Sequence, residues 1–259
     1  MTKESIKLRV SELQNAFKHT QYIEKKALRD FYAANSSDFS EQKFRRVLYR
    51  LEKNSIISST GSGVYYLYED EEPRKMKYRP NPSESLKRIA KRMKKSFPYL
   101  KYQIWETRIL NEFLVLQLGQ NHLILDVEKD ATSSVFNQLS EKYTGKIFLD
   151  PDRSTMARYV QPLPEAIIIS KLVSQTPMGR KVEAIPYAPI EKILVDLLVD
   201  DEKFDTLQEN ELIAIYNGFF DMYLVDPKSL LRYAGRRNAI PKLQEFVSNR
   251  TKIKIFGLD

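Results

Sequence analysis

The sequence has no cysteine and only two histidines, His19 and His122. Without cysteine, the chain cannot hold disulfides, thiolate zinc sites, iron–sulfur clusters or cysteine nucleophiles. A three-histidine metal centre is excluded as well, and a Ser-His-Asp triad would have to use one of the two histidines. The sequence also lacks a P-loop and a dinucleotide-binding fingerprint. We therefore expect a protein that is not an enzyme and that uses no catalytic residue, metal or cofactor.

Long apolar runs are missing too. The longest apolar stretches are only a few residues, as at Ala166–Ile169. A membrane-spanning helix needs about 20 apolar residues, so none is expected. The first ten residues, MTKESIKLRV, are charged and show no apolar core of a secretory signal. We expect a cytoplasmic protein that has no membrane partner.

What the chain does have is a sizeable apolar fraction and an uneven positive charge. Hydrophobic residues make up 42% of its 259 residues, which is enough for one large domain or two smaller ones. The net charge is +8. Residues 76–101 carry nine basic and one acidic side chain, whereas residues 102–259 carry 19 basic and 22 acidic ones. The cationic character therefore belongs to the front of the chain, where it favours a polyanionic partner such as nucleic acid.

The first 68 residues have the pattern of a winged helix-turn-helix domain. Apolar spacing predicts helices over 3–17, 23–34 and 40–53, the last with Ser40 as its N-cap. Two β-prone runs then flank the tip Ser59–Gly63, which predicts a β-hairpin over about 56–68. Three helices followed by a hairpin is the order of a winged helix.

The rest of the chain predicts a larger mixed domain. Residues 69–82 hold three prolines and a charge run and read as a linker, and the domain then spans 83–259. We predict an α+β fold, with a winged helix-turn-helix followed by a mixed α/β domain that ends in helices. Its expected helices are 83–96, 133–143, 190–198, 211–220, 227–237 and 241–248, and its expected strands are 102–107, 113–118, 122–127, 146–149 and 166–172.

The third helix is the predicted DNA reader. Phe44, Val47, Leu48 and Leu51 recur at helical spacing and define its buried face. The remaining positions are mostly cationic, which suits phosphates and guanine edges in the major groove of double-stranded DNA. We predict base contacts from Gln42, Lys43 and Arg46, further contacts from Tyr49 on the same face, phosphate contacts from Arg45, Arg50 and Lys53, and wing contacts from Ser59, Thr60 and Ser62.

Two parts of the sequence resemble one family. Residues 44–57, followed by 61–65, resemble the N-terminal winged helix of AbiEi-type antitoxins, which are transcriptional regulators of type IV toxin–antitoxin (abortive-infection) systems. Residues 189–198 and 230–237 look like helices of that family's C-terminal domain. The resemblance implies a repressor of its own operon that binds inverted repeats and counters a nucleotidyltransferase-like toxin. It suggests Glu191, Asp196, Arg232, Arg236 and Arg237 as functional residues of the antitoxin domain.

Other interpretations remain open. Asp126 and Glu128 would share one strand face, as in metal-dependent nucleases. Lys129 follows at once, however, which breaks the usual spacing and favours an ordinary strand end at the surface. A further alternative is an interaction module whose winged helix binds protein. Glu191 would serve as the partner of an arginine in 232–237. The basic helix 83–96 lies outside the resemblance and would either extend the DNA contact or form a solvated face.

Overall fold

The computed structural model describes residues 8–34, 38–69, 72–179, 181–200 and 202–258. It has a mixed α+β fold, as predicted, and divides into two compact units. The first unit holds the described residues up to Lys77, together with Asp221–Ser229 and the chain from Ile255. The second unit holds Tyr78–Phe220 and Leu230–Lys254. The chain therefore returns to the first unit twice after leaving it within the stretch predicted as a linker.

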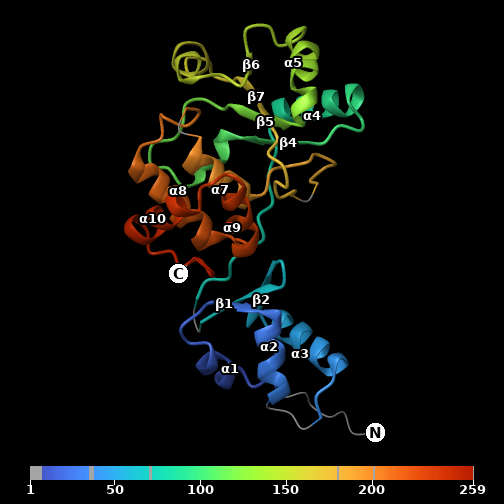
Figure 1. Ribbon diagram of the computed structural model, residues 1–259, viewed down its shortest axis with the longest axis vertical. Coiled ribbons are helices and arrows are strands. Elements are labelled where there is room, and N and C mark those ends of the chain that lie inside the picture. The colour runs from blue at the N-terminus through green and yellow to red at the C-terminus, as the bar shows by residue number, and fades with distance from the viewer. Residues whose placement is uncertain (1–7, 35–37, 70–71, 180, 201, 259) are drawn as a thin grey trace. The chain divides into compact units, whose positions relative to one another are not determined.

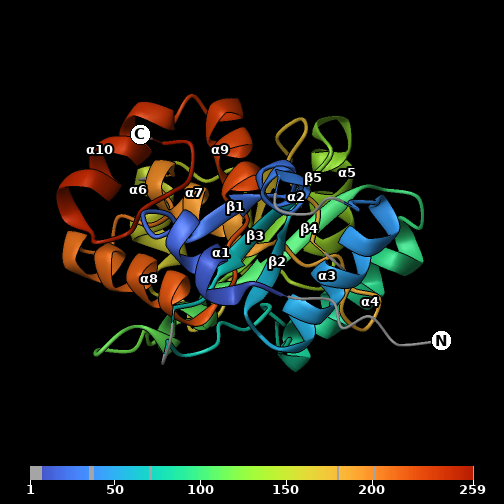
Figure 2. The same cartoon turned by 90° about the horizontal axis from the view of Figure 1, so that it is seen from below.

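The first unit has the element order of a winged helix. Its small antiparallel sheet has β3 between β1 and β2 (Figure 2). The predicted hairpin is confirmed, and the second helix begins at Lys25 because residues 22–24 pair with β3 instead. Residues 3–7 of the first predicted helix lie outside the described residues. The elements are α1 (Val10–Ala16), β1 (Tyr22–Glu24), α2 (Lys25–Ala34), α3 (Glu41–Lys53), β2 (Ile57–Gly61) and β3 (Val64–Leu67).

The core of the first unit fixes which side of α3 faces outward. Phe44, Val47, Leu48 and Leu51 are all buried, as predicted from their spacing. They pack in one apolar cluster with residues from α1, α2 and β2. The Ser40 hydroxyl accepts a hydrogen bond of 3.3 Å from the backbone N–H of Lys43, which confirms the predicted N-cap.

A later segment of the chain completes the first unit. Met76 donates a backbone hydrogen bond of 2.8 Å to Met222, and Leu224 donates one of 2.9 Å to Met76. The Lys228 ammonium group lies 2.6 Å from a carboxylate oxygen of Glu24 in β1. These contacts attach the segment 221–229 to the winged helix.

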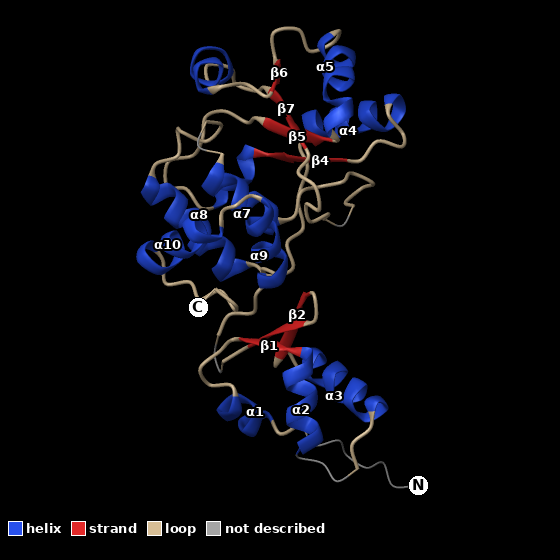
Figure 3. Ribbon diagram, in the orientation of Figure 1, coloured by secondary structure: helices blue, strands red, loops and turns tan. Residues whose placement is uncertain are grey.

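The second unit is built on a four-stranded sheet in the order β4-β5-β7-β6 (Figure 3). β4 runs antiparallel to β5, whereas β5, β7 and β6 are parallel. Helix α4 packs on β4, and α5 packs on β6 and β7. The elements are α4 (Glu84–Ser96), β4 (Tyr102–Glu106), β5 (Leu123–Val127), α5 (Thr132–Ser140), β6 (Ile147–Leu149) and β7 (Ile167–Lys171).

One predicted strand of this unit is wrong. Residues 113–118 form a loop after a 3₁₀ helix at Thr107–Glu112, and Val115 and Leu116 are exposed. β-prone residues form a strand only when a neighbouring strand offers partners, and β5 is already paired on both sides by β4 and β7. The sequence prediction also missed two 3₁₀ turns, including Lys129–Ala131, and the short α6 (Arg153–Thr155) with the π-helical turn Met156–Val160.

Four predicted helices follow the sheet and gather into one cluster (Figure 1). None of the helices described is long and apolar enough to cross a membrane. These four are α7 (Ile190–Val199), α8 (Glu209–Met222), α9 (Pro227–Arg236) and α10 (Ile240–Arg250).

Candidate nucleic-acid interface and a charged pocket

The outer face of α3 is polar and cationic. Gln42, Arg46, Tyr49 and Lys53 follow one another at spacings of four, three and four residues, so they form one stripe opposite the buried face. All four are exposed, and Tyr49 keeps 64% of its surface accessible. Arg45 and Arg50, also exposed, flank this stripe. The helix therefore presents a row of hydrogen-bond donors and positive charge to its surroundings.

Several of these cations have no internal partner. The side chains of Arg45, Arg46 and Lys53 make no hydrogen bond or ion pair with the residues that the structure describes. Lys43 is less exposed than these cations, because it lies at the edge of the outer face, and its ammonium group pairs with Asp38. Arginines and lysines left without carboxylates keep their full charge for an external anion.

The hydroxyl groups of the wing are less available for contacts with DNA than the sequence predicted. The Thr60 hydroxyl donates to the Val64 carbonyl at 3.1 Å, and the Ser62 hydroxyl donates to Asp226 at 2.6 Å. Of the three predicted wing hydroxyls, only that of Ser59 has no hydrogen bond within the described ranges. Two of the hydroxyls are therefore occupied inside the unit.

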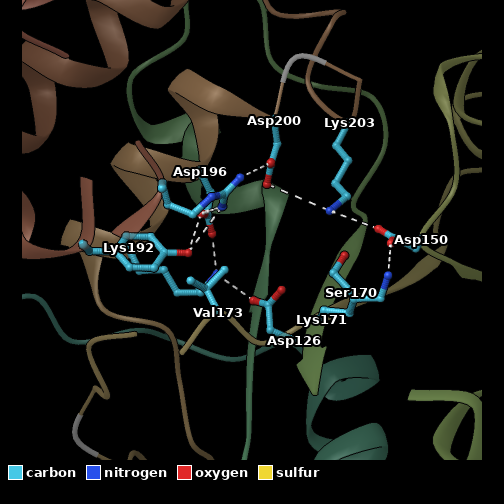
Figure 4. Close-up of a pocket in the computed structure, with 11 residues that line it drawn as sticks. Asp126, Asp150, Ser170, Lys171, Val173, Lys192, Asp196, Asp200 and Lys203 are labelled. Atoms are coloured by element: carbon cyan, nitrogen blue, oxygen red, sulfur yellow. Dashed lines mark hydrogen bonds and ion pairs between the residues drawn. The ribbon is translucent and has the colours of Figure 1, made fainter. Parts of the chain in front are cut away.

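The second unit contains a polar pocket of about 220 Å³. It lies where the parallel strands end, since Asp126 comes from β5, Ser170 and Lys171 come from β7, and Asp150 directly follows β6. The carboxyl ends of parallel strands are the usual place for ligands in α/β sheets. Figure 4 shows how these side chains face those of Lys192, Asp196, Asp200 and Lys203. The other residues that line the pocket are Val173, from the loop after β7, and Tyr233 and Arg237, from the helical part of the chain.

Alternating charges connect most of the pocket walls. The buried ammonium group of Lys192 lies 2.7 Å from Oδ2 of Asp126 and also pairs with Asp196. The second oxygen of Asp196 accepts from the Tyr233 hydroxyl at 2.8 Å and from Arg237 at 2.6 Å. Arg237 in turn pairs with Asp200. Every ionised group in this part of the network has a close partner of opposite charge.

The electrostatic environment of Lys192 reflects these contacts. Burial alone would lower the pKa of its ammonium group, but Asp126 and Asp196 outweigh burial and raise that pKa well above its ordinary value. Burial raises the pKa of the Tyr233 hydroxyl, so this phenol stays protonated and donates to Asp196. The charged form of Lys192 is therefore favoured, and its ammonium group links β5 to α7 through Asp126 and Asp196.

At the end of the pocket formed by Lys203, Asp150 and Ser170, the contacts between side chains are longer. The Lys203 ammonium group lies 3.9 Å from Asp200 and 4.0 Å from Asp150, which are ion-pair distances but not hydrogen bonds. Only 14% of the Lys203 side chain is exposed. The buried hydroxyl of Ser170 has no hydrogen-bond partner among the described residues. This end of the pocket therefore holds donors that the protein does not satisfy.

A protein-family model matches residues 43–253 and describes a family of unknown function, DUF6577. The chain belongs to this family. No curated protein matches the chain. The matched region includes α3 from Lys43 onward and every residue that lines the pocket.

The residues suggested by the resemblance take different positions. Asp196 and Arg237 meet in the pocket, whereas Glu191 is buried on α7 outside its lining. Arg236 donates to the Ser174 hydroxyl, and Arg232 is exposed on α9. The sequence predicted that an arginine of 232–237 pairs with Glu191. Arg237 instead forms its ion pairs with Asp196 and Asp200.

The pair Asp126 and Glu128 is not brought together in this pocket. The predicted surface strand end is wrong for Asp126, which is only 5% exposed and faces Lys192. Glu128 is exposed outside the pocket and accepts a hydrogen bond of 3.3 Å from the backbone N–H of Lys101. No group of acidic and histidine residues within the described part of the chain is arranged to hold a metal ion. Nothing in the described part of this pocket favours a nuclease.

Of the residues that line the pocket, only Asp126, Asp196 and Arg237 were singled out from the sequence. Lys192, Asp196 and Asp200 recur every four residues on and just after α7, which is a pattern of charges along one helix face. This Lys-Asp-Asp series along a largely apolar segment was the available signal. Ser170, Asp150 and Lys203 carried no comparable signal, because only the order of the parallel strands brings them together.

Proposed function

We propose that the chain is a DNA-binding transcriptional regulator whose α3 enters the major groove of double-stranded DNA. The observation that carries this proposal is the outward cationic stripe of α3, with Arg46 at its centre and no carboxylate paired to it within the described ranges. The hairpin that follows α3 supports it, because winged helices combine a reader helix with a neighbouring β-ribbon. The net charge of +8 supports a polyanionic partner.

The roles follow from position on the helix. Gln42 and Arg46 lie in the N-terminal half of the exposed stripe, where they would reach base edges. Arg45, Arg50 and Lys53 lie at its sides and its end, where they would contact phosphates. Lys43 would reach DNA only by exchanging its contact with Asp38. Each phosphate contact contributes a slope of about −0.9 to the dependence of log K on log salt concentration.

The test uses the full chain and DNA from immediately upstream of its own gene, measured by fluorescence anisotropy at several salt concentrations. Arg46→Ala should weaken binding by roughly 1–3 kcal/mol and reduce the preference over an unrelated duplex. Arg158→Ala is the matched control, because Arg158 is an exposed arginine of the second unit without a described partner. Equal affinity of Arg46→Ala and the control would contradict the proposal and would favour a winged helix that binds protein.

We further propose that the regulator is of the AbiEi antitoxin type and counters a nucleotidyltransferase-like toxin. The two C-terminal segments that carry the resemblance form α7 and α9, and Asp196 joins them through Tyr233 at 2.8 Å. Expression of the neighbouring gene of the operon, alone and together with this chain, tests this role. Rescue of growth by the chain is the expected result, and growth arrest that co-expression leaves unchanged would contradict it.

A further inference from the structure

The loose end of the charged pocket has the composition of an anion site. Lys171 and Lys203 converge on a single carboxylate, that of Asp150, at 3.4 and 4.0 Å. The other three carboxylates of the pocket are already engaged by Lys192 and Arg237 at shorter distances. Lys203 also lies 3.9 Å from Asp200, but Arg237 already engages that carboxylate at a shorter distance. Asp150 is therefore the one carboxylate of the pocket that Lys171 and Lys203 share with no other cation of the pocket, and neither contact is a close hydrogen bond.

The Ser170 hydroxyl gives independent evidence for a ligand. Ser170 is 4% exposed, and its oxygen has no hydrogen-bond partner among the described residues. Its side chain points into the pocket, toward the end of Lys203 (Figure 4). Burying a hydroxyl without a partner is unfavourable, so a molecule in the pocket that accepts from Ser170 would relieve this cost.

The deeper wall offers a second kind of contact. Oδ2 of Asp126 is buried and interacts with Lys192 by charge, but it accepts no hydrogen bond of good geometry from a described residue. A carboxylate oxygen in this state accepts a proton donor such as a ligand hydroxyl. The pocket thus combines cationic donors at its loose end with an acceptor beside them.

We propose that this pocket binds a small phosphate monoester. Its phosphoryl group would accept from Lys171, Lys203 and the Ser170 hydroxyl, and a hydroxyl of its organic part would donate to Asp126. Three donors from separate positions match the three terminal oxygens of a phosphoryl group better than the two oxygens of a carboxylate. A pocket of about 220 Å³ limits the ligand to a small metabolite and excludes a nucleic-acid strand.

Calorimetric titration of the full chain with inorganic phosphate at constant ionic strength tests the anion subsite. The expected result is saturable binding that Lys203→Met abolishes and Ser170→Ala weakens by about tenfold, the effect of one hydrogen bond to a charged group. Lys252→Met is the matched control, because Lys252 is an exposed lysine of the second unit outside the pocket. Its affinity should equal that of the unmodified chain.

Two outcomes would overturn the proposal. One is the absence of saturable phosphate binding by the unmodified chain at millimolar concentration. The other is equal phosphate affinity of Ser170→Ala and the Lys252→Met control. Ser170→Ala is suited to this test because it removes a single buried oxygen and keeps the fold. Glycerol 3-phosphate should bind more tightly than phosphate, and Asp126→Asn should reduce this difference. The titrations contain no DNA, so their result does not depend on the proposed regulatory function.

Discussion

The hydroxyl of Ser62, at the tip of the wing, donates a hydrogen bond of 2.6 Å to Oδ2 of Asp226, which lies 164 positions later in the sequence. The other oxygen of Asp226 accepts from the backbone N–H groups of Lys228 and Ser229 at the start of α9. Asp226 therefore fixes the wing and the first turn of a helix at once. It also places a negative charge beside a hairpin that, in the proposed function, approaches DNA phosphates.

Removing this charge should strengthen DNA binding. Asp226→Asn keeps the size of the side chain and its ability to accept from the helix, but it removes the repulsion of nearby phosphates. We expect an affinity increase of about threefold at low salt, because the Asp226 carboxylate is buried and acts on the phosphates only at a distance, as in weak ion pairs worth roughly 0.2–1 kcal/mol. Fluorescence anisotropy with the upstream DNA measures it, and the gain should shrink as salt rises. Unchanged or weaker binding by a folded Asp226→Asn variant would contradict this prediction.

The position of Asp226 beside the wing also explains why residue 61 is a glycine. Gly61 has a φ of +126°, and a Cβ atom added there would lie 2.7 Å from Oδ2 of Asp226. Gly61→Ala should therefore destabilise the first unit by about 2 kcal/mol or more, through backbone strain together with a collision. Gly63→Ala is the control, because its φ is +73° and no atom lies within 4 Å of the added Cβ. Urea denaturation should show the larger loss for Gly61→Ala, and equal losses would show that the contact with Asp226 is unimportant.

Local patterns predicted most of the elements correctly. The predicted N-cap Ser40 accepts its backbone hydrogen bond at 3.3 Å, and Ser83, at the predicted start of helix 83–96, caps α4 in the same way at 3.1 Å. Capping and helical apolar spacing depend on residues a few positions apart, so the sequence contains their full description. The exposed stripe of α3 follows from the same spacing, and this is why its residues were predictable.

Features that depend on distant pairing were not predictable. Residues 113–118 have the composition of a strand but no free strand edge beside β5, whereas residues 22–24 form one because β3 accepts them. The charged pocket has the same origin. Asp126, Ser170 and Lys192 carry no shared sequence pattern, and only the parallel register of β5 with β7 and the packing of α7 bring them together.

Lys192 should be important for stability. Lys192→Met would leave the carboxylates of Asp126 and Asp196 buried without their shared ammonium group. Removing one partner of such a network destabilises a protein by about 3–5 kcal/mol. Lys171→Met is the control, since Lys171 is 57% exposed and its pair with Asp150 is worth about 1 kcal/mol or less. Urea denaturation of both variants tests the difference, and a similar small loss for both would mean that Lys192 is replaceable.

His122 provides a prediction on pH. Burial lowers the pKa of its imidazole, and its Nδ1 atom has no hydrogen-bond partner within the part of the chain described. An unfolded histidine has a pKa of about 6.5, so the unfolded chain takes up a proton there before the folded chain does. Protonation of the unfolded state favours unfolding, and stability should therefore fall as the pH decreases below about 6.5 toward the folded pKa.

Replacing this side chain should remove that part of the pH dependence. We expect the free energy of unfolding to decrease less between pH 7.5 and pH 5.5 in His122→Gln than in the unmodified chain, by about 1 kcal/mol. Carboxylates that titrate near pH 5.5 contribute equally to both proteins, so the difference between the two decreases isolates the histidine. Urea denaturation at the two pH values measures it. Equal decreases would mean that His122 binds its proton equally well in the folded and unfolded states, contrary to its burial.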